Sequence, residues 1–135
     1  MTQENAKLIA QELGLRLSYG VKIRINDKIE TVEGINILDN IVEFGTYMAC
    51  DIDEVKPYLF PLSSMTAEQQ EEFDMIYADD MQVVANNLKN RLNGQPYKMN
   101  YGHYRHIDWL NAHHFDYRGL IEKNLAIDAT NLNVY

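Results

Sequence analysis

The sequence contains few of the residues that cross-link a chain or interrupt its helices and strands: one cysteine, three prolines and seven glycines among 135 residues. Because Cys50 is alone, an internal disulfide is excluded and a reducing compartment is the simplest environment. No apolar run approaches the roughly 20 residues that a membrane-spanning helix requires. The first residues also lack the basic and apolar segments of a signal peptide. We therefore expect a cytoplasmic protein that has no membrane partner.

Basic residues are also scarce, since twelve lysines and arginines stand against twenty acids and give a net charge of −8. The excess of acid lies between Asp51 and Asp80, a segment in which Lys56 is the only base. Proteins that hold phosphate backbones depend on clustered lysine and arginine. The charge distribution therefore argues against a nucleic acid as the partner.

The first fifty residues predict a helix followed by a small antiparallel sheet. Apolar residues at positions 6, 9, 10, 13 and 17 follow helical spacing, with Thr2 as the N-cap and Gly14 as the stop. The segment 20–26 then alternates strictly between apolar and polar residues, as in a half-buried strand. Turn signals at 26–27 and 39–40, with a bulge or bend at Gly34, predict a meander or partial barrel that the helix covers.

The middle of the chain predicts an ordered connector and a long helix. Pro57 and Pro61 disfavour helical geometry at the residues before them, so at most one turn is expected, at 53–55, and the rest of the segment 51–65 is expected to be extended. Thr66 and Gln69 then have the spacing of a capping box. The acidic amphipathic helix that follows is expected to end at 91 or 92. Its apolar stripe consists of Phe73, Ile76, Tyr77, Val84 and Leu88, with Met81 beside it.

The C-terminal part predicts short elements only. A short helix is expected at about 107–114, another capped by Asp116, and a closing strand at 125–129, followed by a loosely held tail. Arg118 is expected to pair with the acidic helix. The predicted fold is thus a single α+β domain over 1–135, in which 1–62 hold the helix and sheet and 63–135 are mainly helical, ending in a short-helical C-terminal cap.

Two motifs resemble a known group of sequences. The segments Lys56-Pro-Tyr-Leu-Phe-Pro-Leu-Ser-Ser-Met-Thr66 and Ile107-Asp-Trp-Leu-Asn-Ala-His-His-Phe-Asp-Tyr-Arg-Gly-Leu-Ile-Glu-Lys123 are similar to a family of short uncharacterised proteins. These proteins are encoded in prophages and mobile elements of Bacteroides-type bacteria. Phe60 and Asn124 depart from the pattern, in which a basic residue and a glycine are expected. The resemblance implies a phage or mobile-element origin and supplies no activity, cofactor or catalytic residue.

All four histidines, His103, His106, His113 and His114, fall within twelve residues, which raises the alternative of a metal-binding protein or small enzyme. The spacing fits no established metal motif, and adjacent histidines on a helix diverge by about 100°. We therefore expect no metal, and we interpret His113 and His114 as groups that close a helix end.

Other reactive groups fit no catalytic signature either. The acidic pairs near 51–54 and 79–80 are interpreted as solvated faces, because exposed acids are the norm. Ser63 and Ser64 lie outside any nucleophile elbow, and Cys50 has no basic neighbour that would favour a thiolate. We expect no catalytic residue and no cofactor, which favours a non-enzymatic protein.

The densest group of aromatic and basic residues lies in 97–118, which gives a second alternative, a weak nucleic-acid binder. Tyrosine and arginine also anchor protein interfaces, whereas Trp109 is interpreted as core. The leading hypothesis is a phage or mobile-element accessory protein that acts through protein–protein contacts or self-association. Its candidate interaction surface consists of Tyr104, Arg105, His113, His114, Tyr117 and Arg118.

Overall fold

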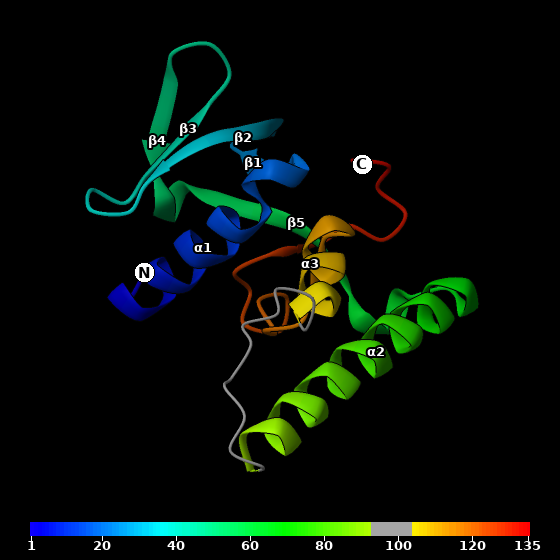
Figure 1. The fold of residues 1–135 in the computed structure, drawn as a ribbon. Coiled ribbons are helices and arrows are strands. Elements are labelled where there is room, and N and C mark those ends of the chain that lie inside the picture. Colours follow the sequence, from blue (N-terminus) through cyan, green and yellow to red (C-terminus); the bar gives the residue numbers. More distant parts are fainter. Residues whose placement is uncertain (93–103) are drawn as a thin grey trace. The chain divides into compact units, whose positions relative to one another are not determined.

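The computed structural model describes residues 1–92 and 104–135, and within them the chain is an α+β protein. Contacts divide it into two compact units. The sheet unit comprises Met1–Ser64 and Asn111–Tyr135, and the α2 unit comprises Met65–Leu110. Figure 1 shows the order of the elements in each. None of the helices in these described ranges is long and apolar enough to cross a membrane.

The sheet unit begins with helix α1, Gln3–Arg16. Its N-cap is confirmed, because the Thr2 hydroxyl accepts a hydrogen bond from the Asn5 amide at 3.1 Å. The predicted apolar face is buried, with Ile9 and Leu13 at 0% exposure. The predicted stop at Gly14 is wrong: the helix continues to Arg16, and a 3₁₀ turn, η1 (Leu17–Tyr19), follows it.

An antiparallel meander follows, as predicted. Its strands are β1 (Lys22–Ile25), β2 (Lys28–Asn36), β3 (Ile41–Phe44) and β4 (Met48–Asp51). The Asn26 turn joins β1 to β2, and Asn26 has the positive φ of 52° that tight hairpins require. The register shifts between Val32 and Gly34, which confirms the predicted bulge.

Strand β5, Val55–Pro61, closes the meander. The 3₁₀ turn η2 (Ile52–Glu54) leads into it, and β5 pairs antiparallel with β1, so the sheet order is β4-β3-β2-β1-β5-β6. The prediction of an extended segment is thus confirmed up to Pro61 and wrong at Leu62–Ser64, which forms a 3₁₀ turn, η3. Helix α1 packs its buried face into the core that the strands form, as expected from a small sheet that needs a cover.

The C-terminal segment returns to β5 rather than forming a helical cap on its own. Strands β6 (Phe115–Asp116) and β7 (Ile127–Asp128) both pair parallel with β5. The predicted helix after Asp116 is instead a turn, whose two amides at Leu120 and Ile121 donate to the Asp116 carboxylate at 2.9 Å each. Gly119 takes the positive φ of 77° within this turn.

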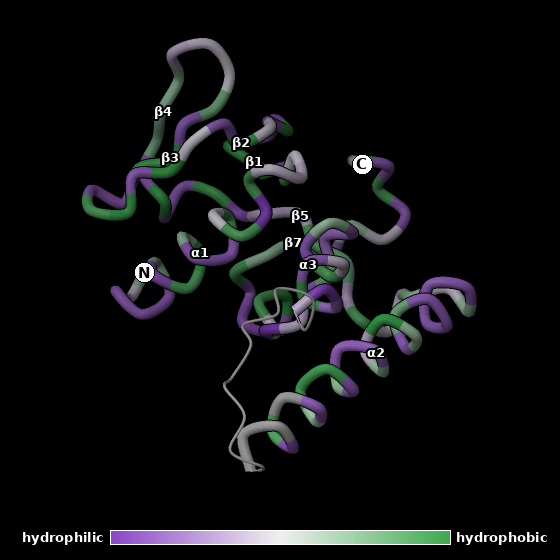
Figure 2. The backbone as a smooth tube through the Cα atoms, viewed as in Figure 1, coloured by the Kyte–Doolittle hydropathy of each residue, from purple (hydrophilic) through white to green (hydrophobic). Residues whose placement is uncertain are grey.

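The α2 unit contains α2, Ala67–Leu92, and the first part of α3, Arg105–Ala112. The capping box is confirmed, because Thr66 and Gln69 exchange hydrogen bonds at 3.0 and 3.1 Å. The ring of Phe73 lies 5.7 Å from that of Trp109 between centroids, which joins the two helices. Figure 2 shows apolar and polar residues alternating along α2, as expected for an amphipathic helix.

Candidate functional site

The four histidines belong to different parts of the chain. His103 lies outside the described residues, His106 belongs to the α2 unit, and His113 and His114 belong to the sheet unit. Within residues 1–92 and 104–135, no three histidine, cysteine or acidic side chains lie close enough together to hold a metal ion. The metal alternative thus gains no geometric support from the described residues.

His106 forms a pair with Asp80, which is fully buried. Its ring Nδ1 lies 2.7 Å from the Asp80 Oδ2, and its backbone amide donates to the same oxygen at 2.8 Å. Arg105 donates to the other oxygen at 3.2 Å. The carboxylate therefore accepts a hydrogen bond from a free backbone amide in the first turn of α3, which is a structural role. The interpretation of 79–80 as a solvated face is wrong for Asp80 and correct for Asp79, which is 74% exposed.

Replacing Asp80 with asparagine should lower the free energy of unfolding of the α2 unit by about 2 kcal/mol. Burial alone would raise the pKa of Asp80, but hydrogen bonds from His106 and Arg105 outweigh it and lower that pKa. The stabilisation is therefore present above the ordinary carboxyl pKa and is lost as the pH falls through the lower folded value. Hydrogen exchange of the α3 amides measures this loss. Asp79→Asn is the matched control, and equal effects of both variants would contradict the assignment.

His114 is buried in the sheet unit at 7% exposure. Its ring stacks on Tyr135 with the centroids 3.7 Å apart, and the Tyr135 hydroxyl donates to the Tyr58 carbonyl at 2.8 Å. The prediction of a loosely held tail is therefore wrong, because Tyr135 is held by these contacts. Burial, followed by the charge of Arg16, lowers the pKa of His114 from 6.5 to about 4. His114 is thus a neutral core group at physiological pH.

Tyr117 and Arg118 belong to a buried ionic network on α1. Arg16, which is 0% exposed, forms an ion pair with Glu12 and donates to the Phe115 carbonyl at 2.6 Å. Arg118 also pairs with Glu12, at 3.0 Å, so the expectation that it pairs with the acidic helix is wrong. The Tyr117 ring lies beside both guanidinium groups, 5.3 Å from Arg16 and 5.9 Å from Arg118. These residues tie the C-terminal segment to α1.

The members of the candidate interaction surface from the sequence are therefore divided between the two units. Tyr104 and Arg105 lie in the α2 unit and are exposed, whereas the other four members lie in the sheet unit. Of those four, His114 is buried, Tyr117 is half-buried within the network, and Arg118 is exposed but paired. His113 is half-buried and stacks on Phe115 with the centroids 6.4 Å apart.

The surroundings of Cys50 disfavour its thiolate form. It is half-buried at the end of the meander, where burial and the neighbouring acids Glu54, Asp51 and Asp53 raise its pKa from 9.0 to about 11. The thiolate, which is the nucleophilic form, is therefore scarce at neutral pH. This agrees with the absence, in the sequence, of a basic neighbour that would favour the thiolate.

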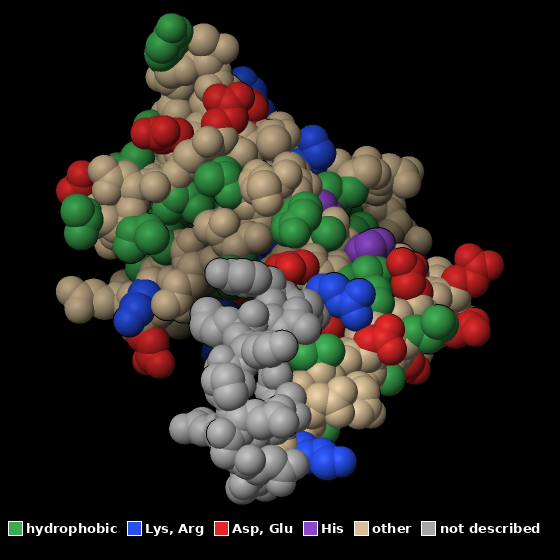
Figure 3. Space-filling view, in the orientation of Figure 1, with side chains coloured by type: hydrophobic (Ala, Val, Ile, Leu, Met, Phe, Trp, Pro, Cys, Tyr) green, Lys and Arg blue, Asp and Glu red, His purple; other side chains and the backbone are tan. Residues whose placement is uncertain are grey.

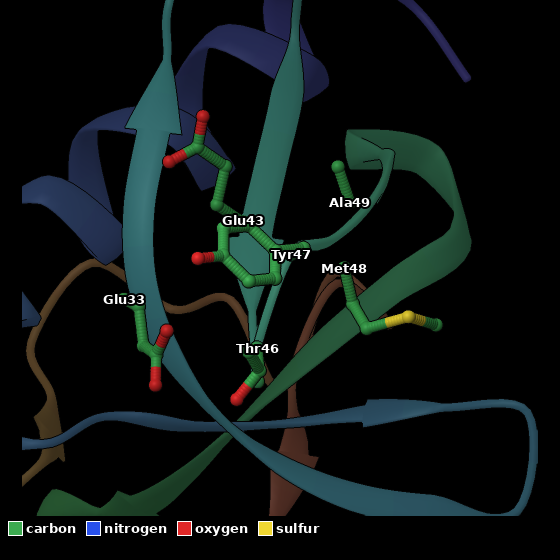
Figure 4. A pocket seen from close by; sticks show the side chains of 7 residues that line it. Glu33, Glu43, Thr46, Tyr47, Met48 and Ala49 are labelled. Atoms are coloured by element: carbon green, nitrogen blue, oxygen red, sulfur yellow. The ribbon is translucent and has the colours of Figure 1, made fainter.

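A hollow in the sheet unit has the features of a binding site. It has a volume of about 530 Å³ and lies at the turn between β3 and β4. We call it the hairpin site; its lining residues are Glu33, Glu43, Gly45, Thr46, Tyr47, Met48 and Ala49. Figure 4 shows the Tyr47 ring between Glu33 and Glu43, with Met48 pointing to the other side. No lysine or arginine lines it, so its polar side chains favour a cation.

The backbone holds two of these side chains in unusual positions. Tyr47 is fully exposed, at 101%, although its φ of 62° is a strained value for a bulky residue. Gly34 allows the Glu43 carboxylate to lie against β2, since a Cβ at Gly34 would come within 2.5 Å of Glu43 Oε2. The sheet thus places an aromatic ring and a carboxylate in the lining of one surface hollow.

A second hollow, of about 360 Å³, shares Gly45 and Met48 with the hairpin site. Apolar side chains of Ile25 and Phe44 line it, and its polar rim includes Asp27, Lys28 and Glu30. The exposed Met48 side chain is thus common to an acidic hollow and a more apolar one. The two hollows together would suit a ligand that carries a cationic group next to an apolar group, with the cation in the hairpin site and the apolar group in the second hollow.

Sequence reasoning missed the residues of the ionic network on α1 and those of the hairpin site. Glu12 and Arg16 fall at positions that continue the apolar spacing of Ile9 and Leu13, and this periodicity was the available signal for their burial. Tyr47 follows Gly45-Thr46 inside a turn, and no residue pattern marks it as a ligand contact. It shares the hairpin site with Glu33 and Glu43, which come from β2 and β3.

Comparison with known proteins gives no family. No family model matches this chain, and no curated protein or solved structure is significantly similar to it.

Proposed function

We propose that this protein is a non-enzymatic, cytoplasmic accessory protein of a phage or mobile element that acts through protein–protein contacts. Its contact surface is the hairpin site, and its partner presents a lysine or arginine next to an apolar side chain. The observation that carries the proposal is the fully exposed Tyr47, held at positive φ between Glu33 and Glu43. A large aromatic ring in this position gains nothing from packing, so a ligand contact is the better reason for it.

The chemistry of the hairpin site fits a cationic side chain. A guanidinium or ammonium over the Tyr47 ring contributes roughly 0.5–1 kcal/mol at an exposed site. Each carboxylate adds about as much or less, because exposed ion pairs are screened by water and salt. The apolar neighbour of the cation then occupies the hollow beside Met48, Ile25 and Phe44. Affinity is therefore modest and decreases as salt increases.

The charge of the whole chain supports the same partner. A net charge of −8 attracts a basic segment and raises its association rate. It also disfavours acidic partners and nucleic acids, whose backbones repel an acidic surface.

Binding should depend on both the ring and the carboxylates. A peptide that alternates arginine with leucine is titrated into the protein by calorimetry, and a second peptide with norleucine in place of arginine tests the charge. We expect Tyr47→Ala to weaken binding of the arginine peptide roughly fivefold, which corresponds to the loss of a cation–π contact of about 1 kcal/mol. Glu43→Gln should weaken it about twofold to fivefold.

The matched controls are Tyr19→Ala and Glu122→Gln, which change an exposed tyrosine and an exposed acid outside the lining of the hairpin site. Gly34→Ala is a further probe, because its methyl group displaces the Glu43 carboxylate without removing it. Equal affinity for the arginine and norleucine peptides, or equal losses in the controls, would exclude the hairpin site as a cation receptor.

A further inference from the structure

Four apolar side chains on α2 are exposed along one line of the helix. These residues, which we call the α2 stripe, are Tyr77 (46% exposed), Met81 (36%), Val84 (42%) and Leu88 (58%). At the N-terminal end of the predicted apolar stripe, Phe73 and Tyr77 contact the His106 ring with centroid distances of 6.3 and 5.2 Å, so Tyr77 is only partly exposed. From Met81 to Leu88 the apolar pattern stays exposed over about two helical turns.

The spacing of the α2 stripe is that of a coiled-coil seam. Its members are separated by four, three and four residues, which is the alternation of the a and d positions of a heptad. At 100° per residue these positions fall within an arc of about 60° on the helix surface. Such a narrow stripe fits a single helix lying along α2, whereas packing on a sheet or a broad core would use a wider face.

We infer that α2 pairs along this stripe with α2 of a second copy of the chain, in antiparallel orientation. The spacing of four, three and four is the same in both directions, so a two-fold axis between positions 82 and 83 matches the stripe to itself. This arrangement places Tyr77 beside the partner's Leu88 and Met81 beside the partner's Val84. Such an interface is isologous, as in most homodimers.

The charges of α2 select the antiparallel orientation. The charged residues in its N-terminal half are all acids: Glu68, Glu71, Glu72, Asp74, Asp79 and Asp80. The C-terminal part, 81–92, has no acid, and its charged residues are Lys89 and Arg91. Figure 3 shows the acidic side chains gathered over the N-terminal end of α2. A parallel pair would align acid with acid, whereas the antiparallel register keeps the two acidic ends apart and places position 74, an aspartate, opposite position 91, an arginine.

The contact is small, so the dimer is expected to be concentration-dependent. From Tyr77 to Leu88 the stripe spans about 17 Å of helix at 1.5 Å per residue. An interface of this length lies at the lower end of the sizes found in specific complexes, and its dissociation constant belongs in the micromolar range. Higher salt should weaken it, because the charges that orient it are exposed.

Sedimentation of the full chain over a concentration series tests the pairing. The wild type should shift from monomer to dimer as concentration rises, and Val84→Glu should raise the dimer dissociation constant more than about tenfold, because it brings an unpaired charge into the seam. Gln82→Glu adds the same charge beside the stripe and should leave the constant within about twofold. A monomer at every concentration, or equal effects of the two variants, would overturn the inference.

Disulfide trapping tests the orientation. Variants are made in a Cys50→Ser background, and a disulfide requires Cα atoms about 4.4–6.8 Å apart. A mixture of Tyr77→Cys and Leu88→Cys should form the mixed disulfide under mild oxidation, while Leu88→Cys alone should remain unlinked. If Leu88→Cys alone cross-links as efficiently as the mixture, the helices are parallel and the antiparallel pair is refuted.

Discussion

Replacing Arg16 with methionine is expected to lower the free energy of unfolding by about 3–5 kcal/mol, a large part of the stability of a small protein. Arg16 is fully buried, and its guanidinium group pairs with Glu12 and donates to the Phe115 carbonyl at 2.6 Å. Methionine fills much of the volume but supplies no charge. Glu12, 1% exposed, then keeps only the partly exposed Arg118 as a cationic partner.

Urea denaturation of purified variants measures this effect. Lys7→Met removes a base from an exposed position of the same helix and should change stability by less than about 0.5 kcal/mol. The double variant Glu12→Gln with Arg16→Met should recover part of the loss, because it no longer leaves a carboxylate buried with half of its pairing gone. A loss below about 1 kcal/mol for Arg16→Met would show that the pair contributes little to the fold.

Acidification from pH 6.5 to pH 4 is expected to remove up to about 3 kcal/mol of stability through His114 alone. The folded pKa of His114 is about 4, whereas the ordinary value is 6.5. Between these values the unfolded chain binds a proton that the folded chain does not. Stability therefore falls as the pH decreases through this window and is fully retained above it. The physical cause is the burial of the imidazole, followed by the charges of Arg16, His113 and Lys22.

The measurement compares the pH dependence of unfolding in the wild type and in His114→Phe. Phenylalanine keeps a ring against Tyr135 but does not titrate, so its free energy of unfolding should change less between pH 6.5 and pH 4. Its absolute stability should be lower at every pH, because the site has a φ of 61° that disfavours bulky residues. An NMR titration of the His114 ring provides the direct test, and a midpoint near 6.5 would refute the assignment.

The sequence predicted correctly those caps, turns and strands that depend on interactions between residues close together in the chain. Thr2, Thr66 with Gln69, and Asn26 were identified as caps and turn, and each has the predicted role. Strict alternation in 20–26 also predicted β1, because one buried face of a strand leaves a period of two. The end of α1 was misplaced because Arg16 is held by Glu12 and by Phe115, which lies 99 residues away in the sequence.

The candidate site could not be predicted in the same way. Glu33, Glu43 and Tyr47 come from two strands and a turn, and the bulge at Gly34 affects how they align. By contrast, the sequence suggested an interaction surface between Tyr104 and Arg118, and polar groups in that segment stabilise the fold instead. Asp116 binds turn amides, and Arg118 binds Glu12. Composition indicates which side chains are versatile, but their partners determine what they do.

By itself, the sequence determined the fold class, the order of helix, meander and long acidic helix, and the amphipathic pattern of each element. These depend on spacing, caps and turns that act over a few residues. Only the tertiary structure decided that β5 is shared by β1, β6 and β7, that Glu12 and Asp80 are buried, and that Tyr47 is exposed. These outcomes depend on contacts between residues far apart in the chain, which leave no periodic signal in it.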